Sequence, residues 1–219
     1  MDRQESKQPR EFDRYFRDWV NTACREWHYP APPDSYYAKV YERLPDGLRS
    51  LIAFGVNAGL ITAMGANFTL KDLPPRKGPY SWFSRGRAEV PAPNWEYFVH
   101  VAEFVRLTTI GKAHGLKVTF EDDTMDIAVY KEGKLLVYYE VKERADQLQK
   151  LIDRIKMEQS RVDLSLPDRG NDPLRKAKCI VKRKPEYFSG LAIGTRFEYK
   201  VVYPEERSFQ LVRDVIPWV

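Results

Sequence analysis

The stretch MDIAVYKEGKLLVYYEVKE, residues 125–143, predicts two β-strands joined by a tight turn. Valine, isoleucine, leucine and tyrosine dominate both arms, and residues 131–134, with one glycine, suit a hairpin turn. Three charged residues stand out against this apolar background. Asp126 lies at the start of the first arm, and Glu140 and Lys142 lie at the end of the second. Strand formation alone does not explain charges at these places.

Alternation along a strand indicates how these charges are arranged. Residues two apart point to the same face, so Glu140 and Lys142 share a face and Val141 points to the other. Asp126 comes near them if the register of the hairpin brings the two ends together. Two neighbouring carboxylates repel each other and need a cation. Oxygen ligands suit Mg²⁺, and a metal with a lysine can activate water and offset charge on a phosphate.

The segments around the hairpin predict a mixed α/β core. Apolar residues recur at helical spacing before the hairpin and again after it, and turn residues separate the segments. We therefore expect an α/β fold with a sheet flanked by helices. The predicted elements are a helix at 95–115, strands at 116–123, 125–133 and 134–143, helices at 144–161 and 173–184, and a closing hairpin at 195–216.

In this setting the charged residues resemble the signature of the PD-(D/E)XK nuclease superfamily. Its members have the restriction-endonuclease-like fold, with an acid near the start of the second core strand and Glu-x-Lys or Asp-x-Lys on the third. Asp126 matches the acid, and Glu140, Val141 and Lys142 match the triplet after thirteen intervening residues. Met125 stands where many members have proline.

Many members of the superfamily add a glutamate from the helix before the strands. Glu103 is the first candidate for it here, and Glu96 is the second. The resemblance covers residues 94–203. Asp122 and Asp123 are alternative acids, for which a solvated turn is the competing interpretation.

The resemblance implies both a reaction and a role for each residue. Asp126, Glu140, the Val141 carbonyl and Glu103 would bind Mg²⁺, for which Mn²⁺ can substitute, and Lys142 would assist the attacking water. The implied activity is hydrolysis of phosphodiester bonds by an endonuclease, with DNA preferred over RNA as the substrate. Many such nucleases cut both strands as dimers, so a homodimer is a candidate assembly.

The chain before the core predicts two further regions. Residues 1–70 are expected to be helical and rich in aromatic side chains, with an apolar segment at 50–68 that predicts one buried helix or two short ones. Residues 71–94 contain prolines, glycines and arginines and predict a linker before a nuclease-like domain at 95–219. Basic side chains predicted to contact a nucleic-acid backbone are Arg76, Lys77, Arg85, Arg87, Lys182 and Lys184.

The lysine-rich run KAKCIVKRK, residues 176–184, leaves two interpretations open. It could follow a phosphate backbone, or it could be a solvated face of a helix or strand. The net charge of +5 permits a polyanionic partner without requiring one.

Composition bounds the cellular setting. The two cysteines, Cys24 and Cys179, form no disulfide framework and no paired zinc motif, and the first residues show no apolar signal segment. The most apolar run, at 50–68, contains asparagines and glycines and falls short of a membrane span. We therefore expect a cytoplasmic protein without a membrane partner.

Two other functional classes remain open. A nucleic-acid-binding module on the same fold would bind without cleaving, and its binding would not need metal. A protein-interaction module would use the N-terminal aromatic side chains to dock a partner and would have no affinity for nucleic acid.

Overall fold

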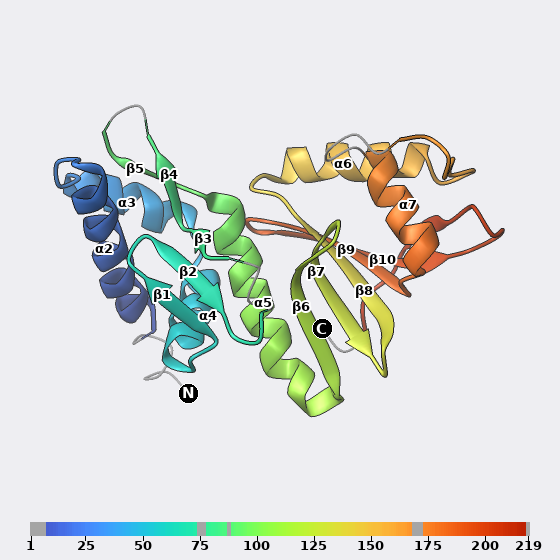
Figure 1. The fold of residues 1–219 in the computed structure, drawn as a ribbon, viewed down its shortest axis with the longest axis horizontal. Helices are drawn as coiled ribbons and strands as arrows, with labels where there is room; N and C mark the ends of the chain where they lie inside the picture. Colours follow the sequence, from blue (N-terminus) through green and yellow to red (C-terminus); the bar gives the residue numbers. More distant parts are fainter. Residues whose placement is uncertain (1–7, 74–77, 87–88, 168–172, 218–219) are drawn as a thin grey trace. The chain divides into compact units, whose positions relative to one another are not determined.

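The fold is described from a computed structural model that covers residues 8–73, 78–86, 89–167 and 173–217, without the side chains of residues 8 and 9 (Figure 1). The chain divides into two compact units, Met1–Arg106 and Leu107–Val219. The predicted basic contacts Arg76, Lys77 and Arg87 lie outside the described residues.

The first unit combines helices with short strands. Helices α2 (Gln8–Trp27), α3 (Asp34–Arg43) and α4 (Asp46–Asn57) precede a small sheet, and the long helix α5 (Trp95–His114) begins in this unit. The small sheet has the order β1-β2-β3, and β4 pairs with β5. The strands are β1 (Ile61–Met64), β2 (Asn67–Leu70), β3 (Tyr80–Ser81), β4 (Phe83–Arg85) and β5 (Pro91–Pro93).

Aromatic side chains at helical spacing form the core of this unit. Phe16 and Trp19 of α2 are buried, and Trp19 stacks on Trp82 with ring centroids 4.9 Å apart. Trp82 also stacks on Phe68 of β2 at 4.0 Å. The aromatic residues therefore serve as packing groups, because their rings face one another inside the unit.

The prediction that residues 1–70 are all helical is wrong. Helix α4 ends at Asn57, and the rest of the apolar segment forms β1 and, after a tight turn, β2. Gly59 and Gly65 both adopt positive φ, at 66° and 63°, and thereby end the helix and close the turn. The segment is apolar as expected, but from Ile61 on its buried residues alternate as in a strand.

The second unit contains a mixed six-stranded sheet of order β11-β10-β9-β8-β7-β6. Every neighbouring pair is antiparallel except β8 and β9, which are parallel. The mixed α/β class predicted from the sequence is therefore confirmed. The strands are β6 (Leu116–Asp122), β7 (Met125–Lys131), β8 (Lys134–Val141), β9 (Tyr187–Ala192), β10 (Thr195–Val202) and β11 (Gln210–Arg213).

The hairpin predicted at 125–143 forms as β7 and β8. Glu132 and Gly133 connect the strands with φ of 51° and 79°, the positive values that a two-residue hairpin turn requires. Strand β8 lies between β7 and β9, and its residues from Leu135 to Val141 are buried. A strand paired on both sides and covered on its faces needs the near-continuous apolar run seen in the sequence.

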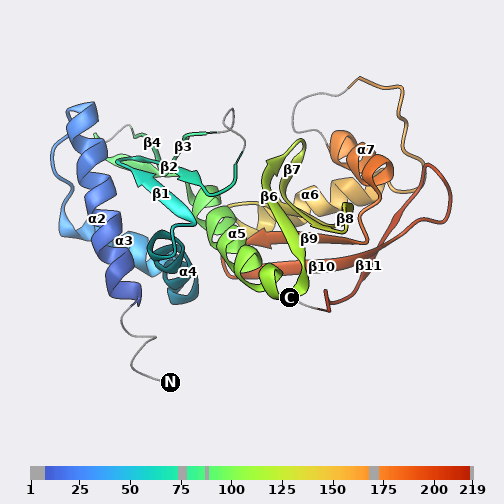
Figure 2. The ribbon, with the colours of Figure 1, turned by 60° about the horizontal axis from the view of Figure 1, so that its bottom comes forward.

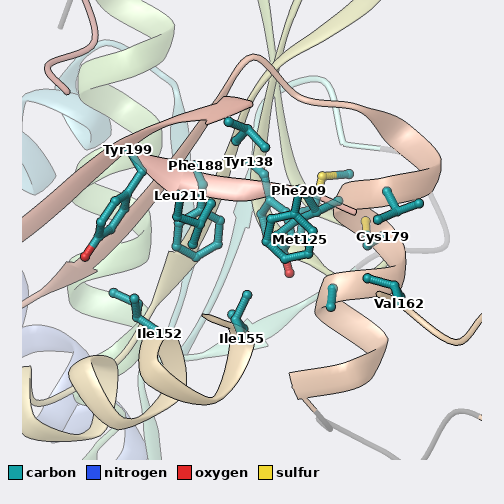
Figure 3. Packing of buried hydrophobic residues seen from close by; sticks show 14 of the residues in the cluster. Met125, Tyr138, Ile152, Ile155, Val162, Cys179, Phe188, Tyr199, Phe209 and Leu211 are labelled. Carbon is teal, nitrogen blue, oxygen red and sulfur yellow. The ribbon is translucent and has the colours of Figure 1, made fainter. Parts of the chain in front are cut away.

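Helices α6 (Ala145–Met157) and α7 (Pro173–Arg183) connect β8 to β9 and pack against the sheet (Figure 2). In α6, Leu148, Ile152 and Ile155 recur at helical spacing and are fully buried. They meet Tyr138 and Phe188 of the central strands in one hydrophobic cluster (Figure 3). The helix predicted at 144–161 is thus present but ends earlier.

Strand β9 was not predicted. Its central Gly190 would place a Cβ 2.9 Å from Leu148 Cδ1 and 3.1 Å from Ile152 Cδ1. Glycine at this position therefore allows α6 to approach the sheet closely. The same residue, with Ser189 beside it, weakens the strand pattern in the sequence.

Two other findings concern expectations from composition. Cys24 and Cys179 are both free and buried. No helix in the described ranges combines the length and apolar character needed to cross a membrane.

Candidate active site

The β7–β8 register brings the two halves of the predicted signature together. Ile127 pairs with Tyr139, so continuing this register by one residue places Asp126 opposite Glu140. The Asp126 Oδ2 atom accepts a hydrogen bond from the backbone N–H of Val141 at 2.6 Å. The acid of the second strand is therefore attached directly to the triplet on the third.

Glu140 has no exposed surface, although its side chain is ionisable. Its Oε1 atom lies 3.2 Å from Lys142 Nζ, which agrees with the expectation that alternate residues share a face. Oε1 is buried beside this cation, and no hydrogen bond to it is found among the described residues. An incompletely satisfied carboxylate oxygen of this kind is a suitable metal ligand.

The other oxygen of Glu140 has two donors. Lys176 of α7 donates from Nζ to Oε2 at 2.5 Å, and the Tyr138 hydroxyl donates to the same oxygen at 3.3 Å. Lys176 is only 5% exposed. Glu140 therefore contacts two ammonium groups, of which only Lys142 was predicted.

Burial raises the pKa of the Glu140 carboxyl above its ordinary value, and the negative charge of Asp126 raises this pKa further. The ammonium groups of Lys176 and Lys142 act in the opposite direction and limit the rise. The direction follows from the complete enclosure of a carboxylate that also faces a second carboxylate.

Lys142 connects the remaining predicted ligand to this group. Its Nζ donates to the backbone carbonyl of Val141 at 2.5 Å, while its side chain is 23% exposed. The ammonium thus lies between Glu140 Oε1 and the Val141 oxygen, two of the atoms predicted to bind metal. Lys142 is also more exposed to solvent than Glu140 or Lys176.

The predicted helix glutamates lie in the other unit. Glu103 and Glu96 are on the part of α5 that belongs to Met1–Arg106, whereas Asp126 and Glu140 belong to Leu107–Val219. Glu103 is buried and binds Arg106 through both oxygens, at 2.6 and 2.9 Å. A cation from its own helix therefore already neutralises Glu103.

The alternative acids have structural partners near the β6–β7 turn. Asp122 accepts hydrogen bonds from the hydroxyl groups of Tyr130 at 2.5 Å and Thr119 at 3.3 Å. Asp123 lies in the turn, and its carboxylate is 3.6 Å from the Arg175 guanidinium. Asp123 is an exposed residue of the turn, as the solvated-turn interpretation expected, whereas Asp122 ends β6 and is partly buried.

The lysine-rich run has two distinct parts. Lys182 and Lys184 are exposed at the end of α7, as both open interpretations expected, but Lys176 and Lys178 are buried. The first-unit candidate Arg85 is exposed and lies over the Trp27 ring at 5.9 Å. Lys176 could have been suspected from the sequence, since it precedes the buried Ile180 by one helical turn.

The oxygen atoms near Glu140 would suit a magnesium site that has few protein ligands. Among the described residues there is no group of three or more His, Cys, Asp or Glu side chains that could hold a metal. Asp126, Glu140 and the Val141 carbonyl supply two carboxylates and one neutral oxygen. Mg²⁺ commonly binds one or two carboxylates and completes its shell with water and phosphate oxygens.

Comparison with known proteins gives no match: no family model, no curated protein and no solved structure is significantly similar to this chain.

Proposed function

We propose that this protein is a Mg²⁺-dependent nuclease that hydrolyses phosphodiester bonds, with DNA as the preferred substrate. The observation that carries the proposal is the contact between Asp126 and the Val141 backbone. It links an acid at the start of one strand to Glu-x-Lys at the end of the next. The Glu140 Oε1 atom beside it is buried and has no hydrogen-bond donor within the described ranges.

Each residue has a role in this proposal. Asp126, Glu140 and the Val141 carbonyl would hold the metal, which supplies a Lewis acid for the phosphate and lowers the pKa of bound water. Lys142 Nζ would donate a hydrogen bond to the attacking water or to a non-bridging phosphate oxygen. The water oxygen would bond to phosphorus and give up a proton, and the bond from phosphorus to O3′ would break. The displaced O3′ would take up a proton, which leaves a 3′-hydroxyl and a 5′-phosphate.

Asp126, Glu140 and Val141, the metal ligands of this proposal, all belong to the second unit. Glu103, predicted as an additional ligand, pairs with Arg106 through both oxygens, which gives it a structural role. Lys182 and Lys184 are exposed cations that could contact the nucleic-acid backbone.

Cleavage of labelled single- and double-stranded DNA and RNA tests the function. Wild type is compared with Lys142→Ala in Mg²⁺, Mn²⁺ or EDTA, and Lys134→Ala, an exposed residue at the start of the same strand, is the matched control. We expect metal-dependent cutting that falls on the order of 10²-fold or more in Lys142→Ala and is unchanged in Lys134→Ala. Equal cutting by all three proteins would reject the proposed role of Lys142.

A second candidate is a nucleic-acid-binding module without cleavage. The favouring observation is that Lys142 and Lys176 already supply two positive charges to the group containing Asp126 and Glu140. This candidate predicts salt-sensitive binding that needs no metal and persists in Glu140→Gln. Absence of both cutting and binding would favour a protein-interaction module instead.

A further inference from the structure

We infer that Lys176 is a displaceable counter-ion of the metal site. It neutralises Glu140 in the metal-free protein and competes with a divalent cation for the same carboxylate. The inference rests on the proposed function, because it takes Glu140 as a metal ligand. Under this inference Lys176, which lies outside the two strands of the signature, controls how tightly the metal binds.

The contact is built by the tertiary fold. Lys176 and Glu140 are 36 residues apart and come from α7 and β8, yet Nζ lies 2.5 Å from Oε2. Lys176 is 5% exposed and Glu140 is fully buried. Long, flexible lysines are rarely buried to this extent without a charged partner, so Glu140 accounts for the position of this side chain.

The charges around the Lys176–Glu140 contact affect how tightly a metal could bind. Asp126 and Glu140 carry two negative charges, and Lys142 and Lys176 carry two positive charges around them. A magnesium–oxygen bond is about 2.0–2.1 Å, so a metal on Glu140 would lie close to an ammonium that remained on Oε2. In a buried site the repulsion between them is weakly screened, so a metal on Oε1 favours movement of Lys176 away from Oε2.

Lys178 provides an internal comparison. It lies two residues further along α7 and is 4% exposed, but its Nζ donates to the backbone carbonyl of Leu166. Removing Lys178 also removes a buried ammonium from the same helix without removing a contact with Glu140. It is therefore the matched control for loss of charge and packing.

Calorimetric titration of the full chain with Mn²⁺ tests the inference. Lys176→Met should bind Mn²⁺ about tenfold or more tightly than wild type, because its competitor is gone, and Lys178→Met should bind like wild type. Glu140→Gln should lose most of the binding. Lys176→Gln, which keeps a hydrogen-bond donor but no charge, should also bind more tightly and serves if the methionine variant does not fold.

Thermal unfolding supplies a second readout. Without metal, Lys176→Met should unfold at a lower temperature than wild type, since a buried carboxylate is left with less compensation. Saturating Mn²⁺ should raise its unfolding temperature more than that of wild type.

The outcomes separate this inference from the proposed function. Unchanged or weaker Mn²⁺ binding in both Lys176 variants, with binding still lost in Glu140→Gln, would overturn the counter-ion role and leave the metal site standing. Mn²⁺ binding by none of the proteins would overturn the metal site and the inference together.

Discussion

The carboxylate of Asp126 accepts a hydrogen bond from the backbone N–H of Val141 at 2.6 Å, across the β7–β8 hairpin. This contact gives Asp126 a structural role in addition to the proposed catalytic one, because it pairs an N–H of the buried central strand. Substitutions at this position can separate the two roles.

Asp126→Asn should keep the fold and lose the activity. The amide oxygen of asparagine can still accept the Val141 N–H, so we expect unfolding free energy to change by about 1 kcal/mol or less. The lost negative charge should weaken metal binding and reduce cleavage. Urea unfolding and a cleavage assay on the same preparation check both parts.

Asp126→Ala is the companion variant. It leaves the Val141 N–H without its acceptor and should cost about 1–3 kcal/mol of stability. If Asp126→Asn were as destabilised as Asp126→Ala, the separation of the two roles would be wrong.

The raised pKa of Glu140 predicts a pH dependence of stability. Because the folded protein holds this proton more tightly than the unfolded chain, the contribution of Glu140 is most favourable below the ordinary pKa of 4.5 and is lost as pH rises through the folded pKa. Glu140→Gln cannot titrate and should lack this component.

Urea unfolding of both metal-free proteins from acid to neutral pH measures it. The difference in unfolding free energy between wild type and Glu140→Gln should shift against wild type as pH rises above 4.5. A difference that stays constant over this range, or shifts the other way, would contradict a raised pKa.

Gly190→Ala should destabilise the second unit. The added Cβ would lie 2.9 Å from Leu148 Cδ1, on the residue that pairs with Glu140 in the parallel β8–β9 register. We expect a loss of about 1–3 kcal/mol from overpacking, measured by urea unfolding. Gly47→Ala is the control, since nothing lies within 4 Å of its added Cβ, and it should be neutral or slightly stabilising. Equal effects of the two substitutions would contradict the close approach of α6.

The hairpin could be predicted because its information is local. Strands β7 and β8 contain their own apolar pattern and turn, but the register shifts by one residue between Val129 and Tyr130. The sequence therefore predicts the hairpin but leaves its register open. The pairing next to the turn would place Asp126 opposite Tyr139, and the shift places it opposite Glu140.

Other features depend on contacts that are distant in the sequence. Strand β9 has a weak sequence pattern because Gly190 accommodates the close approach of α6. Lys176 is buried beside Glu140, a partner 36 residues away in the sequence. Strands β1 and β2 were assigned to a helical region because a short apolar run does not distinguish the two structures. In each case a tertiary partner decides what the local sequence leaves open.

The most direct test of the central claim is single-turnover cleavage of labelled DNA by wild type and Glu140→Gln, in Mg²⁺ and in EDTA, with equal amounts of folded protein. A metal-dependent nuclease centred on Glu140 predicts cutting by wild type in Mg²⁺, none in EDTA, and a loss on the order of 10²-fold or more in Glu140→Gln. Cutting by Glu140→Gln at the wild-type rate, or cutting that persists in EDTA, would contradict the claim.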